Sequence, residues 1–301
     1  MLRFSRFVSG GKRMKKILLQ LDADEHPSVF DAVTALDAEV DVLLRHGNVR
    51  AASVQALIHG LLFPRGPEEL HHSAVFIGGS SVTAGEEILD ATKAAFFGPF
   101  RVSVLFDANG CNTTAAAATA KIAAAAGGLE GKHVVVLGGT GPVGCRAAAL
   151  LAKAGARVFL TSRTFSRAEA TAQSLLERFG ATVCPVVARS PEETRSILEG
   201  AEIVLAAGAA GVTLLPESVW TSLSELKVLA DCNAVPPAGI EGIKPGWNGR
   251  EREGKILFGA LGIGELKMRV HKACLKRLFE ASDRIWDAEE VFAEAREHMT
   301  T

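Results

Sequence analysis

The 301-residue sequence predicts an α/β fold with two domains, each built on a mostly parallel β-sheet. Short continuous apolar runs alternate with helical segments along most of the chain, which is typical of parallel strands buried on both faces. The length exceeds that of one ordinary domain, and the pair Gly127-Gly128 separates two such series. With 48% hydrophobic and 22% charged residues, the chain has enough apolar material for a sizeable core.

The composition also excludes several kinds of function. The 33 basic and 34 acidic side chains nearly cancel, so no basic surplus favours binding to nucleic acid. Tyrosine is absent, which excludes dehydrogenases that use a Tyr-x-x-x-Lys pair. The five cysteines form no C-x-x-C pair, and no apolar run is long enough to span a membrane. We therefore expect a cytoplasmic protein with reduced thiols, and neither a metal site nor membrane association.

The first domain is expected over residues 14–126, preceded by a leader at residues 1–13. The leader is basic and lacks the long apolar core of a secretory signal, so we expect it to be disordered. Within the domain, apolar runs predict strands at 16–21, 40–44, 74–78 and 102–106. The segments that follow them predict helices at 28–36, 51–60, 82–97 and 114–126.

The second domain is expected over residues 127–250. Its apolar runs predict strands at 133–137, 157–161, 182–187, 202–206 and 226–230. Helices are expected at 142–154, 166–179 and 191–200. Residues 233–254 are rich in Pro and Gly and predict a long loop. The last segment, 251–301, predicts helices at 265–280 and 287–298 that return to the first domain.

A glycine motif follows the first strand of the second domain. Gly139, Gly141 and Gly144 fit G-x-G-x-x-G between a strand and a helix. The first glycine is expected to permit the tight turn, the second to let the backbone approach a pyrophosphate, and the third to let the helix pack on the strand. The amides and dipole at the start of the helix favour an anion. We therefore expect a dinucleotide on the loop of Gly139, Thr140, Gly141, Pro142, Val143 and Gly144.

The end of the next strand favours NADP over NAD. An NAD site usually carries an acid there for the ribose hydroxyls, but this sequence has Ser162 and Arg163, followed by Arg167. An arginine binds a 2′-phosphate through two parallel hydrogen bonds, and the serine hydroxyl can donate a third. The nearest acid, Glu169, fits a capping box with Ser166. The alternative is that the arginines form a solvated surface.

Small or polar residues after later strands extend the predicted cofactor site. Ala207 and Gly208 would let the nicotinamide ribose pass close to the backbone, although helix–sheet packing explains them equally well. Asn233 follows the last strand of this domain and is expected beside the nicotinamide.

Polar residues at the strand ends of the first domain predict a substrate site. Asp22 and Asp24 end the first strand, on the edge of a parallel sheet where ligands gather, and a carboxylate there could stabilise a cationic product, although a solvated turn explains them equally well. A polar cluster follows the fourth strand and could bind polar edges of a substrate: Asp107, Asn109, Asn112, Thr113 and Thr114. Asn112 is also expected to be the N-cap of the next helix.

Seven phrases of the sequence together resemble one enzyme family. They are PSVFD (27–31), FIGG (76–79), FFGPFRVS (96–103), D-x-N-G-x-N-T-T (107–114), VLGGTGPVG (136–144), D-x-N-A-x-P-P-x-G-I-x-G-I (231–243) and FGALGIGxLKxxxHxAC (258–274). Their order and spacing resemble the methylene-tetrahydromethanopterin dehydrogenases of methylotrophic bacteria, over residues 14–298.

The resemblance implies a Rossmann NADP-binding domain inserted in an amino-acid-dehydrogenase-like α/β substrate domain. It implies a homo-oligomer, a trimer or hexamer, that oxidises methylene-tetrahydromethanopterin to the methenyl form in one-carbon metabolism and formaldehyde oxidation. Some members also accept methylene-tetrahydrofolate. The methylene carbon lies between two nitrogens, so loss of hydride to NADP leaves a resonance-stabilised cation and needs no proton abstraction. A chain without tyrosine can therefore catalyse it by alignment and exclusion of water.

By the same resemblance, Lys267 lies near the pterin. Gly259, Gly262 and Gly264 predict a flexible approach to the helix, with Lys267 in its first turn, where the helix dipole disfavours a cation. Such a placement suggests a function, and we expect Lys267 to bind and orient the pterin. His271 lies one turn further on the same face and is a second substrate-binding candidate, although a structural histidine is the simpler explanation.

Two other functions stay open at this point. One is a shikimate- or amino-acid-dehydrogenase-like NADP oxidoreductase, which reduces a carbonyl with a Lys–Asp pair; Lys267 lies too near the C-terminus for the usual arrangement. The other is a non-catalytic NADP-binding sensor, which would keep the glycine motif but would need no second cleft.

Overall fold

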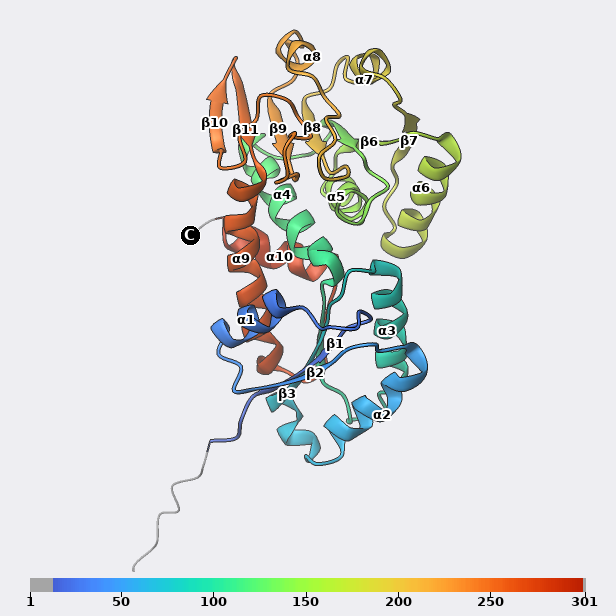
Figure 1. Ribbon diagram of the computed structural model, residues 1–301, viewed down its shortest axis with the longest axis vertical. Helices are drawn as coiled ribbons and strands as arrows, with labels where there is room; N and C mark the ends of the chain where they lie inside the picture. Colours follow the sequence, from blue (N-terminus) through green and yellow to red (C-terminus); the bar gives the residue numbers. More distant parts are fainter. Residues whose placement is uncertain (1–12, 300–301) are drawn as a thin grey trace, which may run out of the picture.

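The computed structural model describes residues 13–299, which form two β-sheets separated by a layer of helices (Figure 1). The first sheet is parallel, in the order β12-β4-β3-β1-β2. Its strands are β1 (Ile17–Leu21), β2 (Val42–His46), β3 (Ser73–Ile77), β4 (Ser103–Phe106) and β12 (Ile285–Trp286). The accompanying helices are α1 (Val29–Asp37), α2 (Ala51–Leu62) and α3 (Val82–Ala94), with 3₁₀ turns η1 (Pro67–His72), η2 (Ala108–Gly110) and η3 (Leu278–Glu280).

The second sheet has the order β10-β11-β9-β8-β5-β6-β7 and is parallel except for the antiparallel pair β10–β11. Its strands are β5 (His133–Leu137), β6 (Arg157–Ser162), β7 (Cys184–Val187), β8 (Ile203–Ala206), β9 (Val228–Asp231), β10 (Asn248–Arg252) and β11 (Lys255–Phe258). Its helices are α5 (Pro142–Lys153), α6 (Phe165–Phe179), α7 (Pro191–Ile197) and α8 (Glu217–Thr221). The strands β5, β6, β7, β8, β9 and β11 follow the doubly wound order of dinucleotide-binding domains. The predicted α/β fold is confirmed.

The predicted loop at 233–254 is wrong in its last part, because it contains β10. This strand is polar and lies exposed at the sheet edge, so no apolar pattern marks it in the sequence. Glu253 and Gly254, both with positive φ, turn the chain from β10 directly into β11, as in a type I′ hairpin. The predicted domain limit at residue 250 therefore falls inside a strand, and the second sheet continues to Phe258.

Helix α4 (Cys111–Ala125) runs through the centre of the molecule and packs against α5, α9 (Ala260–Arg277) and α10 (Ala288–Glu297). Its alanines are buried, and their small side chains let these helices approach closely. The C-terminal segment reaches the first sheet, because β12 pairs with β4 and α9 packs on α1.

Two predicted helix starts are wrong. Helix α4 begins at Cys111 after Gly110, so Asn112 lies within its first turn and is not the N-cap. Helix α9 begins at Ala260, before the predicted residue 265. Gly262 lies within α9. A Cβ at this position would come within 2.2 Å of the Trp247 carbonyl oxygen, so the close contact requires glycine. That glycine serves close packing and does not make the segment flexible.

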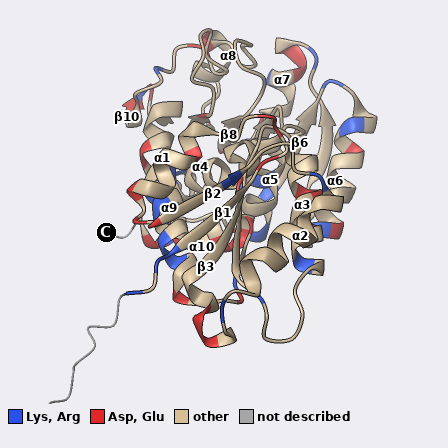
Figure 2. Ribbon diagram, turned by 60° about the horizontal axis from the view of Figure 1, so that its bottom comes forward, with Lys and Arg blue, Asp and Glu red and all other residues tan. Residues whose placement is uncertain are grey.

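The predicted leader lies outside the described residues except for Arg13, whose guanidinium pairs with Asp41 at 2.7 Å. Within residues 13–299 no helix is long and apolar enough to cross a membrane. Acidic and basic residues are interspersed along the helices of both domains (Figure 2).

Candidate functional site

Each sheet carries a cavity at the point where its strand order reverses. In the second sheet this point lies between β5 and β8, and a cavity of about 540 Å³ lies beyond their carboxyl ends. In the first sheet it lies between β1 and β3, beside a cavity of about 380 Å³. Open parallel sheets bind ligands at these switch points, because adjacent loops diverge there and leave a crevice.

The glycine loop forms one wall of the larger cavity. Gly138 takes the left-handed conformation at φ +67°, so the tight turn that we expected at Gly139 lies one residue earlier. Gly139 instead packs on β6, where a Cβ would come within 2.7 Å of Leu160. A Cβ on Gly144 would come within 2.8 Å of the Gly138 and Gly139 backbone, so this glycine packs the helix on the strand as predicted.

The predicted loop residues divide into lining and supporting ones. Thr140, Gly141 and Pro142 line the cavity, together with Ala207 and Gly208 from the end of β8. No side chain caps α5, so the amides of its first turn are available to an anion. This wall therefore fits the phosphates of a dinucleotide.

Three of the predicted cofactor residues support the loop from behind and do not line the cavity. These are Gly139, Val143 and Gly144. Asn233 also lies outside the lining, since its amide accepts a hydrogen bond from Val235 N at 3.0 Å and donates one to the Pro237 carbonyl at 3.1 Å. It shapes the loop after β9.

The far wall of the larger cavity is basic. Ser162, Arg163 and Arg167 line it, and so does Arg189, which follows β7 and donates from Nε to the Arg163 carbonyl at 3.2 Å. The predicted capping box is absent, because α6 begins at Phe165 with Thr164 as its N-cap and without a side-chain cap. None of the described residues lining this cavity is acidic. The wall suits a phosphate better than a free ribose hydroxyl pair.

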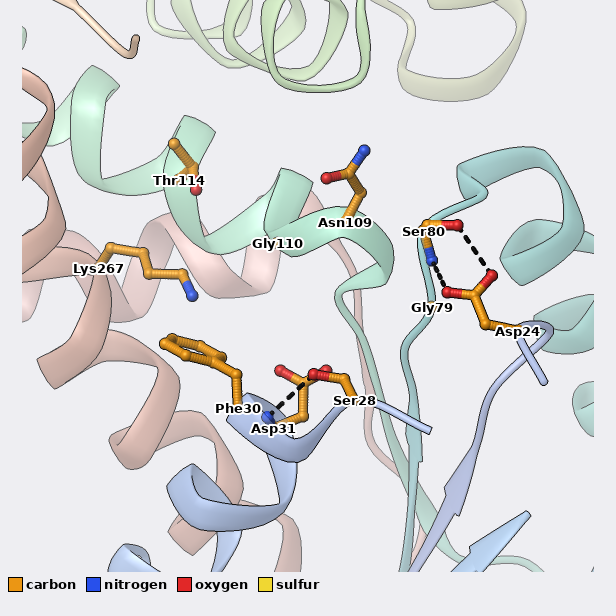
Figure 3. Close-up of a pocket in the computed structure, with 10 residues that line it drawn as sticks. All are labelled: Asp24, Ser28, Phe30, Asp31, Gly79, Ser80, Asn109, Gly110, Thr114 and Lys267. Carbon is orange, nitrogen blue, oxygen red and sulfur yellow. Dashed lines mark hydrogen bonds between the residues drawn. The ribbon is translucent and has the colours of Figure 1, made fainter. Parts of the chain in front are cut away.

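Lys267 lines the smaller cavity (Figure 3), but its predicted place in the first turn of a helix is wrong. It lies two turns into α9 and not in the first turn, so the helix dipole does not disfavour its charge. Its Nζ lies 4.4 Å from the centre of the Phe30 ring. A Cβ on Gly110 would lie 3.7 Å from this ammonium group. Among the described residues no carboxylate forms an ion pair with Lys267, so its ammonium group is available to a ligand.

Carboxylates surround this ammonium group at longer range. Burial raises the pKa of Asp31, which lines the cavity, to about 6; Asp107 and Asp22 add to the rise, whereas Ser28 and Lys267 oppose it. Burial also raises the pKa of Asp107, against the effect of Lys267. Asp107 accepts hydrogen bonds from the backbone N–H of Asn112 at 2.9 Å and from the hydroxyl of Thr113 at 2.6 Å. Asp107 is therefore held in a fixed position outside the lining, whereas Asp31 forms part of the cavity wall.

The structure brings only part of the predicted substrate set into this cavity. Its lining includes Asp24, Asn109, Thr114 and Lys267. Asp22 is buried beside it and accepts from the backbone N–H groups of Asp24 and Ser28, so it shapes the turn after β1. Asn112 and Thr113 are also fully buried. These three residues, like Asp107, act from outside the lining.

His271 is buried against Phe76, with ring centroids 5.5 Å apart, and neither ring nitrogen has a hydrogen-bond partner in the described structure. Burial, together with the charge of Lys267, lowers the pKa of His271 to about 3. The imidazole is therefore neutral at physiological pH and does not line the cavity. This position favours the structural explanation.

Several lining residues were missed by the sequence reasoning. Phe30 and Asp31 lie in the first turns of α1, where Ser28 caps the helix by accepting from Asp31 N at 3.2 Å. Ser80 donates through its N–H and its hydroxyl to Asp24, at 2.8 Å each (Figure 3). A Ser-x-x-Asp pattern directly after a strand could have indicated Asp31, since ligands gather at that edge.

The chain is similar to several known proteins and protein families. Residues 29–109 match the family model for the N-terminal part of methylene-tetrahydromethanopterin dehydrogenase, and residues 126–239 match a putative NAD(P)-binding model. Among solved structures, quinate dehydrogenase from Corynebacterium glutamicum is similar at 16% identity and a TM-score of 0.49, covering 95% of this chain and 99% of that one. Shikimate dehydrogenase from Aquifex aeolicus has 16% identity and a TM-score of 0.47, covering 96% and 99%. Such distant likenesses carry no argument about function.

Two curated relatives from Methylorubrum extorquens match nearly the whole chain. The bifunctional protein MdtA is 46% identical over 284 residues, which is 94% of this chain and 99% of the relative. The NAD(P)-dependent methylenetetrahydromethanopterin dehydrogenase is 32% identical over 281 residues, which is 89% and 93%. These matches confirm the resemblance found in the sequence: the chain belongs to the methylene-tetrahydromethanopterin dehydrogenase family.

Proposed function

We propose that this protein oxidises methylene-tetrahydromethanopterin to the methenyl form by direct transfer of hydride to NADP. The observation that carries the proposal is the pairing of two switch-point cavities, one lined by the glycine loop and three arginines, the other by Lys267 and Asp31. Family membership supports the substrate class, since both curated relatives cover nearly the whole chain.

The nucleotide is held by the second domain. The first-turn amides of α5 would hold the pyrophosphate, and Gly208 would leave room for the nicotinamide half at the end of β8. Arg163, Arg167 and Arg189 bind the 2′-phosphate. When bound, NADP supplies the carbon that accepts the hydride.

The pterin is held by the first domain, where Lys267 donates a hydrogen bond to an acceptor on the pterin ring and orients it. One C–H bond of the methylene group breaks and its electron pair leaves with the hydrogen, so the carbon becomes an amidinium-type cation. No proton is removed at this carbon. Asp31, ionised above its pKa of about 6, places negative charge beside the cation, which lowers the energy of its formation.

The described residues lining the smaller cavity include neither histidine nor cysteine; Asp31, with a pKa of about 6, is the group there that titrates nearest to neutral pH, and the reaction uses its charge and not its basicity. His271, on the buried face of α9, stays neutral and packs against Phe76. The chain's task is alignment of two reactants held on different domains. Action in the cytoplasm, a homo-oligomeric state and the shared use of methylene-tetrahydrofolate remain predictions.

Turnover of the purified protein tests the proposal. With NADP and methylene-tetrahydromethanopterin we expect NADPH to form, and with NADP and shikimate or an amino acid we expect none. A parallel assay with methylene-tetrahydrofolate measures the second carrier. NADP binding without turnover of any one-carbon carrier would favour a sensor, and turnover of shikimate would favour the carbonyl-reducing alternative.

A further inference from the structure

A buried arginine joins the two domains behind the cavities. Arg146 lies on α5, one turn after Pro142 of the nucleotide loop, and is 3% exposed. Its Nε donates to Oδ1 of Asn112 on α4 at 2.7 Å, and its Nη2 donates to Oε1 of Glu86 on α3 at 2.7 Å. One side chain therefore holds the second domain to α3 and to α4, and α4 contributes Thr114 to the pterin cavity.

Asn112 connects Arg146 to residues beside the pterin cavity through three further hydrogen bonds. Its Nδ2 donates to the Phe106 carbonyl at 2.7 Å and to Oδ1 of Asp287 at 2.8 Å. Its backbone N–H donates to Oδ1 of Asp107 at 2.9 Å. Since each of these groups is fully used, Asn112 has one orientation, and Arg146 is connected to the carboxylate beside Lys267 through a single residue.

The charges in this contact are balanced. Arg178, at the end of α6, donates to Glu86 and, at 2.6 Å, to Asp287. Although burial alone would raise the pKa of Asp287, the guanidinium groups of Arg178 and Arg146 lower it, so this carboxylate is ionised. Because Arg146 is buried, neutralised and bonded to two fixed acceptors, it sets the distance and angle between α5 and the helices α3 and α4. A mobile ion pair on the surface would not.

We propose that Arg146 is a positioning residue for hydride transfer: through Asn112 it fixes the nucleotide loop at a set distance from the pterin cavity. The proposal rests on the proposed function, which places the two reactants on different domains. Pro142 lines one cavity, and Gly110 and Thr114, on either side of Asn112, line the other. Any rotation between α4 and α5 at this contact therefore changes the separation of the reacting carbons.

Arg146→Lys tests the proposal, because lysine keeps the charge but cannot donate to Asn112 and Glu86 with the same fixed geometry. We expect kcat to fall roughly 10- to 100-fold, since a misplacement of about 1 Å costs that much. The NADP Kd, measured by calorimetry, and the pterin KM should change less than about threefold, because both cavities keep their linings. Amide hydrogen exchange should become faster at Asn112 and Thr113.

Lys153→Ala is the matched control. Lys153 lies at the other end of α5 and pairs with Glu289 of α10 at 2.5 Å, an exposed contact between the same two parts of the molecule. We expect its kcat to equal that of the unmodified protein. Equal losses in Lys153→Ala and Arg146→Lys would show that general loosening, and not the Arg146–Asn112 contact, explains the effect.

A folded Arg146→Lys protein that keeps kcat within about twofold would overturn the proposal, and so would a loss explained entirely by a weaker NADP Kd. If Arg146→Lys does not fold, Glu86→Gln decides, because it leaves an acceptor oxygen for Arg146 on a partly exposed helix. We expect a smaller fall in kcat with an unchanged KM, and an unchanged kcat would contradict the proposal. Failure of the proposed function is recognised separately, as absence of turnover in the unmodified protein.

Discussion

Asp31→Asn should stabilise the protein while it impairs the site. Asp31 is mostly buried, and its pKa is raised from 3.8 to about 6, so between these two pH values the native state holds a proton that the unfolded chain has released. The unmodified protein therefore loses stability as the pH rises through about 4 to 6, and the loss is complete above that range. At 1.36 kcal/mol per pH unit the full cost is about 3 kcal/mol, an upper limit, and we expect Asp31→Asn to recover about 1–3 kcal/mol at pH 8.

Urea unfolding at pH 4.5 and pH 8 measures this effect. The gain in free energy of unfolding should be about 1 kcal/mol or less at pH 4.5 and should reach its full size at pH 8. The helix cap survives the change, because the backbone N–H of residue 31, and not its side chain, donates to the Ser28 hydroxyl oxygen. Asp37→Asn, on the same helix but exposed and paired with Lys272 at 2.7 Å, is the control, and its effect should be small at both pH values. A gain that is absent at pH 8, or equal at both pH values, would refute the explanation by burial.

Further changes test individual residues of the two cavities and the start of the chain. Arg163→Ala should raise the NADP KM roughly 10- to 100-fold, since a charge-assisted phosphate contact contributes about 1.5–3 kcal/mol, and should affect NAD little; equal losses with both would mean that Arg163 is structural. Lys267→Ala should lower kcat/KM for the pterin on the order of 10²-fold with NADP binding intact, whereas His271→Ala should cost much less. An active Lys267→Ala with an inactive His271→Ala would contradict these roles. A chain that begins at Met14 should turn over normally with an unchanged Tm, and a Tm lower by several degrees would show that residues 1–13 pack on the body.

Local pattern predicted most of the fold. The buried strands are continuous apolar runs, and the glycine motif lies between a strand and a helix, so both could be read from neighbouring residues. Strand β10 could not, because an exposed polar edge strand carries no apolar signal and forms only through its pairing with β11. The early start of α9 could not be predicted either, because Gly262 suggests a flexible segment, whereas in the fold it allows close packing against the distant Trp247.

The sequence predicted the site residues that lie in local motifs, but not those that only the fold brings to the site. Lys267 and Arg163 lie in recognisable phrases, and both line cavities. Arg189 and Phe30 become site residues only because β7 lies beside β6 and α1 lies beside α9. Asn112 shows the opposite error: its polar side chain suggested a ligand contact, but the fold uses it between Arg146 and Asp287.

In the proposed reaction, hydride passes directly from the methylene carbon to NADP without an intervening proton transfer. Methylene-tetrahydromethanopterin deuterated at the methylene carbon tests it, with mass spectrometry and nuclear magnetic resonance of the NADPH formed in ordinary water. We predict one deuterium at C4 of each NADPH, and no deuterium when unlabelled substrate is turned over in heavy water. Solvent hydrogen in the NADPH would contradict the account, because it would require a protein group that exchanges with water to carry the hydrogen between the two reactants.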